Sequence, residues 1–184
     1  EGTGLNGRSV LRQVDIATGE ALREVALPNQ FFGEGIATFG DRIYQLTWRA
    51  HFGFLYDKQT LEVTGRFSYP TEGWGLTTDG THLVLSDGSA SLFFRDPETF
   101  EEIRRIEVRE GDRSVDQLNE LEYIEGDIYA NIWHSNQIVR ISAESGEVLG
   151  RLDLTELVSS VDVSDPEAVL NGIAYDADGN RLFI

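Results

Sequence analysis

The sequence lacks cysteine and methionine, has only four prolines, and contains a single lysine among its basic residues. Without cysteine it can form no disulfide, no thiolate metal site and no cysteine nucleophile. No run of apolar residues approaches the ~20 needed to span a bilayer. No segment keeps a 3.6-residue apolar period over three turns, so we predict an all-β chain with one short helix near residues 153–159.

Positive charge is also scarce. Fifteen basic residues face 32 acidic ones, which gives a formal net charge of −17. Such a surface repels phosphate backbones and anionic lipids, so we expect neither a nucleic-acid partner nor a membrane partner. Hydrophobic residues make up 40% of the 184 residues, enough for a packed core. We therefore expect one globular domain over residues 1–184.

Two half-units alternate along the chain. One carries an Asp-x-x-Thr turn before a strand, at 15–18, 57–60 and 96–99, with a degenerate copy at 142–145. The other is a Gly-apolar strand followed by a Gly-Asp or Asp-Gly hairpin, aligned on Gly35, Gly75, Glu120 and Gly172. Four-stranded units of ~40–45 residues are typical of β-propeller blades. Because the chain opens and stops inside units, we predict about four blades, with parts of the first and last missing.

The residue before each aligned position stands out. These residues are Glu34, Trp74, Asn119 and Asn171. The first strand of a propeller blade lines the central channel, so equivalent positions of successive blades form a ring around the axis. A position in a packed core would carry Val, Ile or Ala. We interpret the ring as a site; the alternative is that these side chains only satisfy backbone groups of turns.

Two tryptophans follow this ring at a fixed distance. Trp48 lies fourteen residues after Glu34, and Trp133 lies fourteen after Asn119. That spacing is one hairpin out and back, which returns each indole to the level of its ring residue. Tryptophan could simply fill blade cores, but the next blade has no aromatic residue at this position. The sequence thus predicts a carboxyl group, a carboxamide and indoles in one site.

Several long motifs carry a resemblance to a known family. They are FGEGIA, GDRIYQLTW, GFLYD, EGWGLTTDG, LSDGS, LNELEYIEGDIYANIW and LNGIAYD. Together they resemble the plant and bacterial glutaminyl cyclases, or glutaminyl-peptide cyclotransferases, which are five-bladed β-propellers. The resemblance implies an acyltransferase that converts the N-terminal glutamine of peptides or proteins into pyroglutamate and releases ammonia. It also implies no cofactor, a monomer, and a periplasmic or secreted location; a structural calcium ion is left open.

The resemblance also implies roles for individual residues. The essential acid of the family falls on Glu34, which would move the proton between the attacking amine and the departing ammonia. Its substrate-site residues fall on Trp48, Trp74, Asn119 and Trp133, to which the ring adds Asn171. Two family elements, an aromatic-Thr-Gln-Gly segment and a lysine-bearing Thr-Gly-Lys segment, would precede residue 1 and follow residue 184. We expect no metal ligands among these residues.

Two other functions fit the same ring. A carboxylate with two carboxamides suits a hard cation, as in a calcium-dependent lactonase-type propeller, although Trp74 in the ring counts against it. A non-catalytic binding propeller is the third hypothesis, because a fold does not determine a function.

Overall fold

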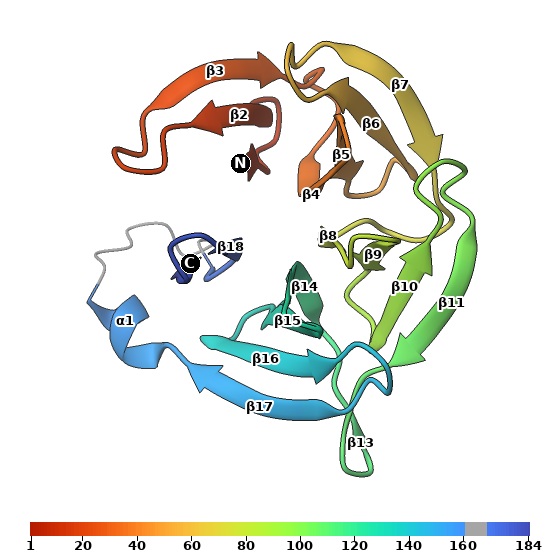
Figure 1. Ribbon diagram of the computed structural model, residues 1–184, viewed down its shortest axis with the longest axis vertical. Helices are drawn as coiled ribbons and strands as arrows, with labels where there is room; N and C mark the ends of the chain where they lie inside the picture. Colours follow the sequence, from red (N-terminus) through yellow and green to blue (C-terminus); the bar gives the residue numbers. More distant parts are fainter. Residues whose placement is uncertain (161–168) are drawn as a thin grey trace.

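The computed structural model describes residues 1–160 and 169–184, which form β-strands apart from one short helix. Three antiparallel four-stranded sheets stand around a central axis like propeller blades (Figure 1). Their strands are β4 (Gly33–Phe39), β5 (Arg42–Thr47), β6 (Phe52–Asp57) and β7 (Val63–Ser68); β8 (Leu76–Thr78), β9 (Leu83–Ser86), β10 (Ser91–Arg95) and β11 (Glu102–Glu107); and β14 (Leu118–Ile124), β15 (Asp127–Ile132), β16 (Gln137–Ser142) and β17 (Val148–Asp153). In each sheet the strands run in chain order from the axis outward.

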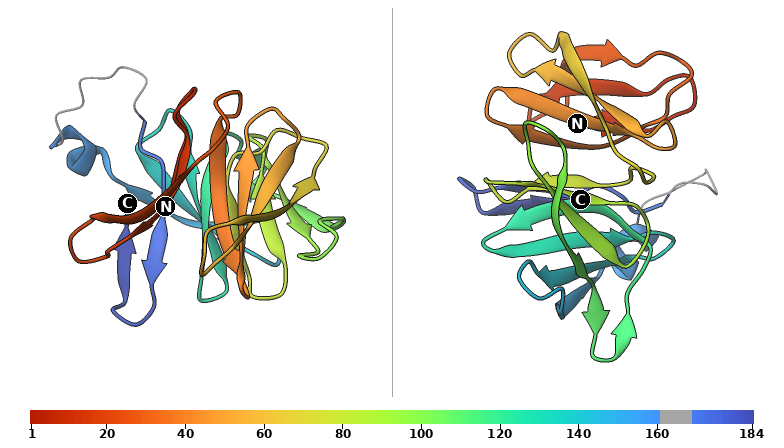
Figure 2. Two further views of the ribbon diagram at one scale, coloured as in Figure 1. Left: turned by 90° about the horizontal axis from the view of Figure 1, so that it is seen from above. Right: turned by 90° about the vertical axis from the view of Figure 1, so that its right-hand side faces the viewer.

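Two smaller sheets occupy further positions around the same axis. One contains β1 (Gly2–Thr3), β2 (Val10–Val14) and β3 (Ala21–Ala26), and the other contains β18 (Ala174–Asp176) and β19 (Arg181–Phe183). A hairpin of β12 (Arg109–Glu110) and β13 (Arg113–Ser114) projects from the ring (Figure 2). The predicted β-propeller with incomplete first and last sheets is confirmed, as is the helix, α1 (Thr155–Ser159). Within the described ranges, no helix has the length and apolar character to cross a membrane.

The Asp-x-x-Thr turns connect the last two strands of a sheet. Asp15, Asp57 and Asp96 each use one carboxylate oxygen to accept the backbone N–H groups two and three residues later, at 2.8–2.9 Å. The degenerate copy keeps one such bond, from the backbone N–H of Ser145 to the hydroxyl of Ser142. These bonds satisfy backbone donors that the strands leave unpaired, so the turn recurs with the blade.

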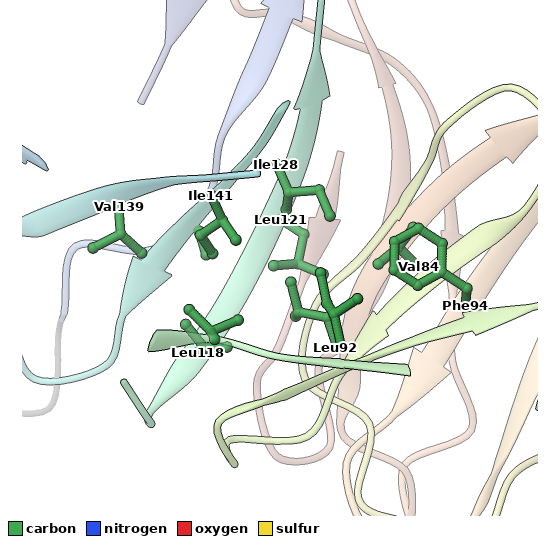
Figure 3. Packing of buried hydrophobic residues seen from close by; sticks show 11 residues of the cluster. Val84, Leu92, Phe94, Leu118, Leu121, Ile128, Val139 and Ile141 are labelled. Carbon is green, nitrogen blue, oxygen red and sulfur yellow. The ribbon is translucent and has the colours of Figure 1, made fainter. Parts of the chain in front are cut away.

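The hydrophobic core lies between the blades, because each sheet packs face to face against the next. Figure 3 shows one such layer, in which Val84 and Leu92 of one blade meet Leu121 and Ile128 of its neighbour. Two equivalent layers join the first three sheets. Removing this apolar surface from water is the main stabilising contribution, and it requires that the blades stay in contact.

Near the axis, neighbouring blades come close enough for their backbones to hydrogen-bond. The N–H of Gly35 donates to the carbonyl of Trp74 at 2.8 Å. One blade further, the Ser86 hydroxyl accepts from the N–H of Gly75 and donates to the carbonyl of Asn119, both at 2.7 Å. A Cβ on Gly75 would lie 2.1 Å from that carbonyl oxygen. Glycine is therefore required there for steric reasons.

We expect Gly75→Ala to destabilise the fold by at least ~2 kcal/mol, because the added methyl group must push one blade away from the next. Gly150→Ala is the matched control: this glycine lies in β17, and an added Cβ would meet nothing within 4 Å. Urea unfolding of both variants checks the expectation. Equal unfolding midpoints for the two would contradict the close approach of the blades.

Candidate active site

β-bulges place two of the predicted site residues. The pairing of β4 with β5 changes register at Glu34 and Gly35. The pairing of β14 with β15 changes register in the same way at Asn119 and Glu120. A bulge leaves its residues outside the regular ladder and redirects their side chains. Two innermost strands thus carry an irregularity at the ring position itself.

The predicted indoles form one cluster. The rings of Trp74 and Trp133 meet edge to face, with centroids 5.3 Å apart. The ring centroids of Trp48 and Phe32 are 5.8 Å apart. Trp74 also covers Gly88, where a Cβ would lie 2.7 Å from the indole and where φ is +83°. Gly88 aligns with Trp48 and Trp133 in the repeat. The second blade lacks an aromatic residue at this position because the indole of Trp74 fills the space.

Glu72 joins this cluster, although sequence reasoning did not single it out. Its Oε2 accepts the indole N–H of Trp48 at 2.8 Å and that of Trp74 at 3.0 Å. Its Oε1 accepts the Nε–H of Arg49 at 2.9 Å. Burial alone would raise the pKa of Glu72, but the hydrogen bonds from the two indoles and Arg49 outweigh that effect and leave the pKa below its usual value. Glu72 is therefore ionised at neutral pH.

Glu34 is in the opposite state. Desolvation by burial, with a smaller contribution from the negative charge of Glu72, raises the pKa of Glu34 to about 8. Its carboxyl group is therefore mostly protonated at neutral pH, in the range that suits a general acid or base. Asn119 is buried, and its Oδ1 has no hydrogen-bond partner among the residues that the structure describes. That oxygen is therefore a buried acceptor whose donor is not found among these residues.

Asn171 occupies its ring position but turns its side chain to a neighbour. It is exposed, and its Oδ1 accepts the backbone N–H of Glu120 at 3.4 Å. With Glu34 and Glu120 it lines a channel of about 930 Å³ along the axis, to which Glu122 also contributes. This contact is of the backbone-satisfying kind that was the alternative for the whole ring. Among the described residues, no three acidic or histidine side chains gather to hold a metal ion.

Glu120 and Glu122 are two further residues that sequence reasoning missed. Burial raises the pKa of Glu120 well above its usual value, and the nearby charge of Glu34 adds to this effect. Burial also raises the pKa of Glu122, against hydrogen bonds from Tyr175 and Thr77. A signal for Glu120 exists in the repeat, because it is the one acidic residue at a position that is otherwise glycine.

The chain is thus a β-propeller in which one innermost strand carries a desolvated carboxyl group and the connections between strands carry a linked set of indoles. The family model for glutamine cyclotransferase matches residues 1–184, and the chain belongs to this family. The resemblance seen in the motifs is thereby confirmed.

Two relatives support the same assignment. The chain is 41% identical over 187 residues to the glutaminyl-peptide cyclotransferase of Arabidopsis thaliana; the match covers all of this chain and 58% of that protein. The crystal structure of Myxococcus xanthus glutaminyl cyclase matches with a TM-score of 0.91 and 36% identity, over 98% of this chain and 78% of that one. A Bacteroides caccae protein of unknown function, with a TM-score of 0.55 and 13% identity over 97% of this chain and 61% of its own, shares the fold alone.

The raised pKa of Glu34 predicts how stability depends on pH. Its folded-state pKa of about 8 exceeds the ordinary value of 4.5, so folding favours the protonated form and stability falls as pH rises from about 4.5 to about 8. Glutamine has no such proton to lose. We expect Glu34→Gln to match the wild type near pH 4 and to be more stable by about 4–5 kcal/mol at pH 8.5. Urea unfolding at both pH values measures this; a stability difference that does not change with pH would contradict the buried acid.

Proposed function

We propose that the chain provides the catalytic face of a glutaminyl-peptide cyclotransferase, which converts an N-terminal glutamine into pyroglutamate and releases ammonia. The observation that carries the proposal is the raised pKa of Glu34, to which the charge of Glu72 contributes, while the same Glu72 carboxylate binds the indoles of Trp48 and Trp74. The names of the Arabidopsis and Myxococcus relatives support it. The chain spans 58% of the length of the Arabidopsis protein. The activity is therefore proposed for the full-length protein that contains this chain.

The reaction is intramolecular and balances without a cofactor. The neutral α-amine of the substrate attacks its own γ-carboxamide carbon, and a C–N bond closes a five-membered lactam. The bond from that carbon to the side-chain nitrogen then breaks. The amine loses one proton and the leaving nitrogen gains one, so ammonia departs and no group of the protein changes its oxidation or bonding state. No side-chain nucleophile is needed.

Glu34 has the form that this proton transfer requires. A protonated carboxyl group can donate from one oxygen to the leaving nitrogen and accept the amine proton on the other, and it ends the cycle as it began. Burial keeps it protonated near neutral pH, whereas an exposed glutamate would be ionised. Asn119 offers its unpaired Oδ1 as an acceptor for a substrate N–H.

The indoles address the other difficulty, which is conformational. A glutamine side chain is flexible, and its amine meets its carboxamide only when it is curled. Trp48, Trp74 and Trp133 present rigid apolar surfaces against which the methylene groups of a curled side chain can pack. Orientation of this kind can contribute several kcal/mol of a possible ~7–11.

We expect Glu34→Gln to lower kcat by ~10²–10⁴ with a small change in KM, because it removes the proton donor but keeps the shape of the side chain. The assay follows ammonia release and pyroglutamate formation on peptides that begin with glutamine. Glu110→Gln is the control, since Glu110 lies on the projecting hairpin and pairs with Arg151 of β17. Turnover of the Glu34 variant within a few-fold of the control would remove Glu34 from this role.

The same mechanism predicts a narrow pH optimum. The substrate amine must be neutral, and its pKa is ~7.7–8.0. Glu34 must be protonated, and its pKa is about 8. The dependence of kcat/KM on pH is therefore a bell centred near pH 8. It rises as the substrate amine loses its proton and falls as Glu34 loses its own. A rate that keeps rising through pH 10 would show that ionised Glu34 is the active form.

A further inference from the structure

We propose that Glu72 is a positioning residue of this site: its carboxylate holds the indoles of Trp48 and Trp74 in place as one wall of the substrate pocket. This role in turnover rests on the proposed function, whereas the hydrogen bonds themselves do not. Glu72 lies in the connection from β7 to β8, two residues before Trp74 in the same connection, whereas Trp48 directly follows β5.

The contacts of Glu72 converge on a single atom. Oε2 accepts both indole N–H groups, at 2.8 Å and 3.0 Å, from tryptophans that belong to neighbouring blades. Trp74 then meets Trp133 of a third blade edge to face. Moving the carboxylate would therefore disturb all three indoles. One side chain in a loop fixes a wall that no single blade could build.

The chemistry of the donor explains why a carboxylate is suited to this place. An indole N–H can only donate, and it makes a stronger hydrogen bond to an ionised acceptor than to a neutral one. Because Glu72 accepts the N–H groups of both Trp48 and Trp74, the polar atoms of these indoles are satisfied and only apolar ring surface is left to contact a substrate. Arg49 donates its Nε–H to the other carboxylate oxygen, Oε1. The Cζ atom of Arg49 also lies 3.8 Å from the centroid of the Trp48 ring, so the guanidinium contacts both the carboxylate and one of its indoles.

Both oxygens of Glu72 are thus engaged within the protein. The residue acts on substrate through the indoles and does not touch it. Its charge has a second effect, because it contributes to the raised pKa of Glu34. A residue with only a structural role would affect folding but would not be expected to move the titration of Glu34.

The chain offers a direct test, because it contains only three tryptophans and all lie in this cluster. The indole N–H signals of these three residues in a ¹H–¹⁵N spectrum are assigned by single Trp→Phe variants. On acidification we expect the Trp48 and Trp74 signals to move together with one midpoint, below the usual pKa of glutamate. This shared titration disappears in Glu72→Gln and persists in Glu110→Gln. If the two signals titrate unchanged in Glu72→Gln, Glu72 does not hold the indoles.

Kinetics tests the consequence for turnover. Glu72→Gln keeps an oxygen that can accept both indoles but removes the charge, so we expect KM to change little and the alkaline limb of kcat/KM to move to lower pH. Glu72→Ala removes both the acceptor oxygen and the charge, so we expect it to raise KM by roughly three- to tenfold. An unchanged pH profile in Glu72→Gln and an unchanged KM in Glu72→Ala would overturn the proposal. If the wild type releases no ammonia, the proposed function fails, and the indole spectra still decide the role of Glu72.

Discussion

The close approach of the innermost strands is the constraint on which this structure depends. Gly35 donates its N–H to the next blade, and a Cβ at Gly75 would lie 2.1 Å from the carbonyl oxygen of Asn119. Only glycine allows the backbones to meet at these points. The blades can then bury their shared faces, and the residue just before each glycine is held at the axis. Glu34 and Trp74 owe their placement to the same contact that closes the fold.

The site combines two glutamates in opposite protonation states. No residue that the structure describes donates a hydrogen bond to the Glu34 carboxyl group, so burial favours its protonated form. Glu72 receives two indoles and a guanidinium, so its charge is stabilised. Because their surroundings separate the pKa values of these two glutamates, their roles differ: Glu34 can exchange protons, and Glu72 provides a fixed charge. Burial of the apolar layers between the blades offsets the unfavourable free energy of burying Glu34.

Much of this arrangement is predictable from sequence, because the repeat specifies it. Blade boundaries follow from turns that recur with each unit, and Trp48 and Trp133 follow from the length of one hairpin. The repeat could not predict Glu72, because it lies in a connection and no other blade has an equivalent. Nor could it predict that Asn171 would turn to a backbone group, since this depends on local space rather than on register. Glu120 carried a signal as the exception among glycines, but its burial became apparent only in the folded structure.

The protonation of Glu34 is the central physical claim, and ¹³C NMR of side-chain carboxyl groups tests it most directly. In a chain labelled at glutamate, the signal that disappears in the Glu34→Gln variant belongs to Glu34. The account predicts that this signal titrates with a midpoint of about 8. A midpoint near 4.5, the ordinary value for glutamate, would mean that the carboxyl group is solvated and ionised at neutral pH, and the proton transfer described here would have no donor.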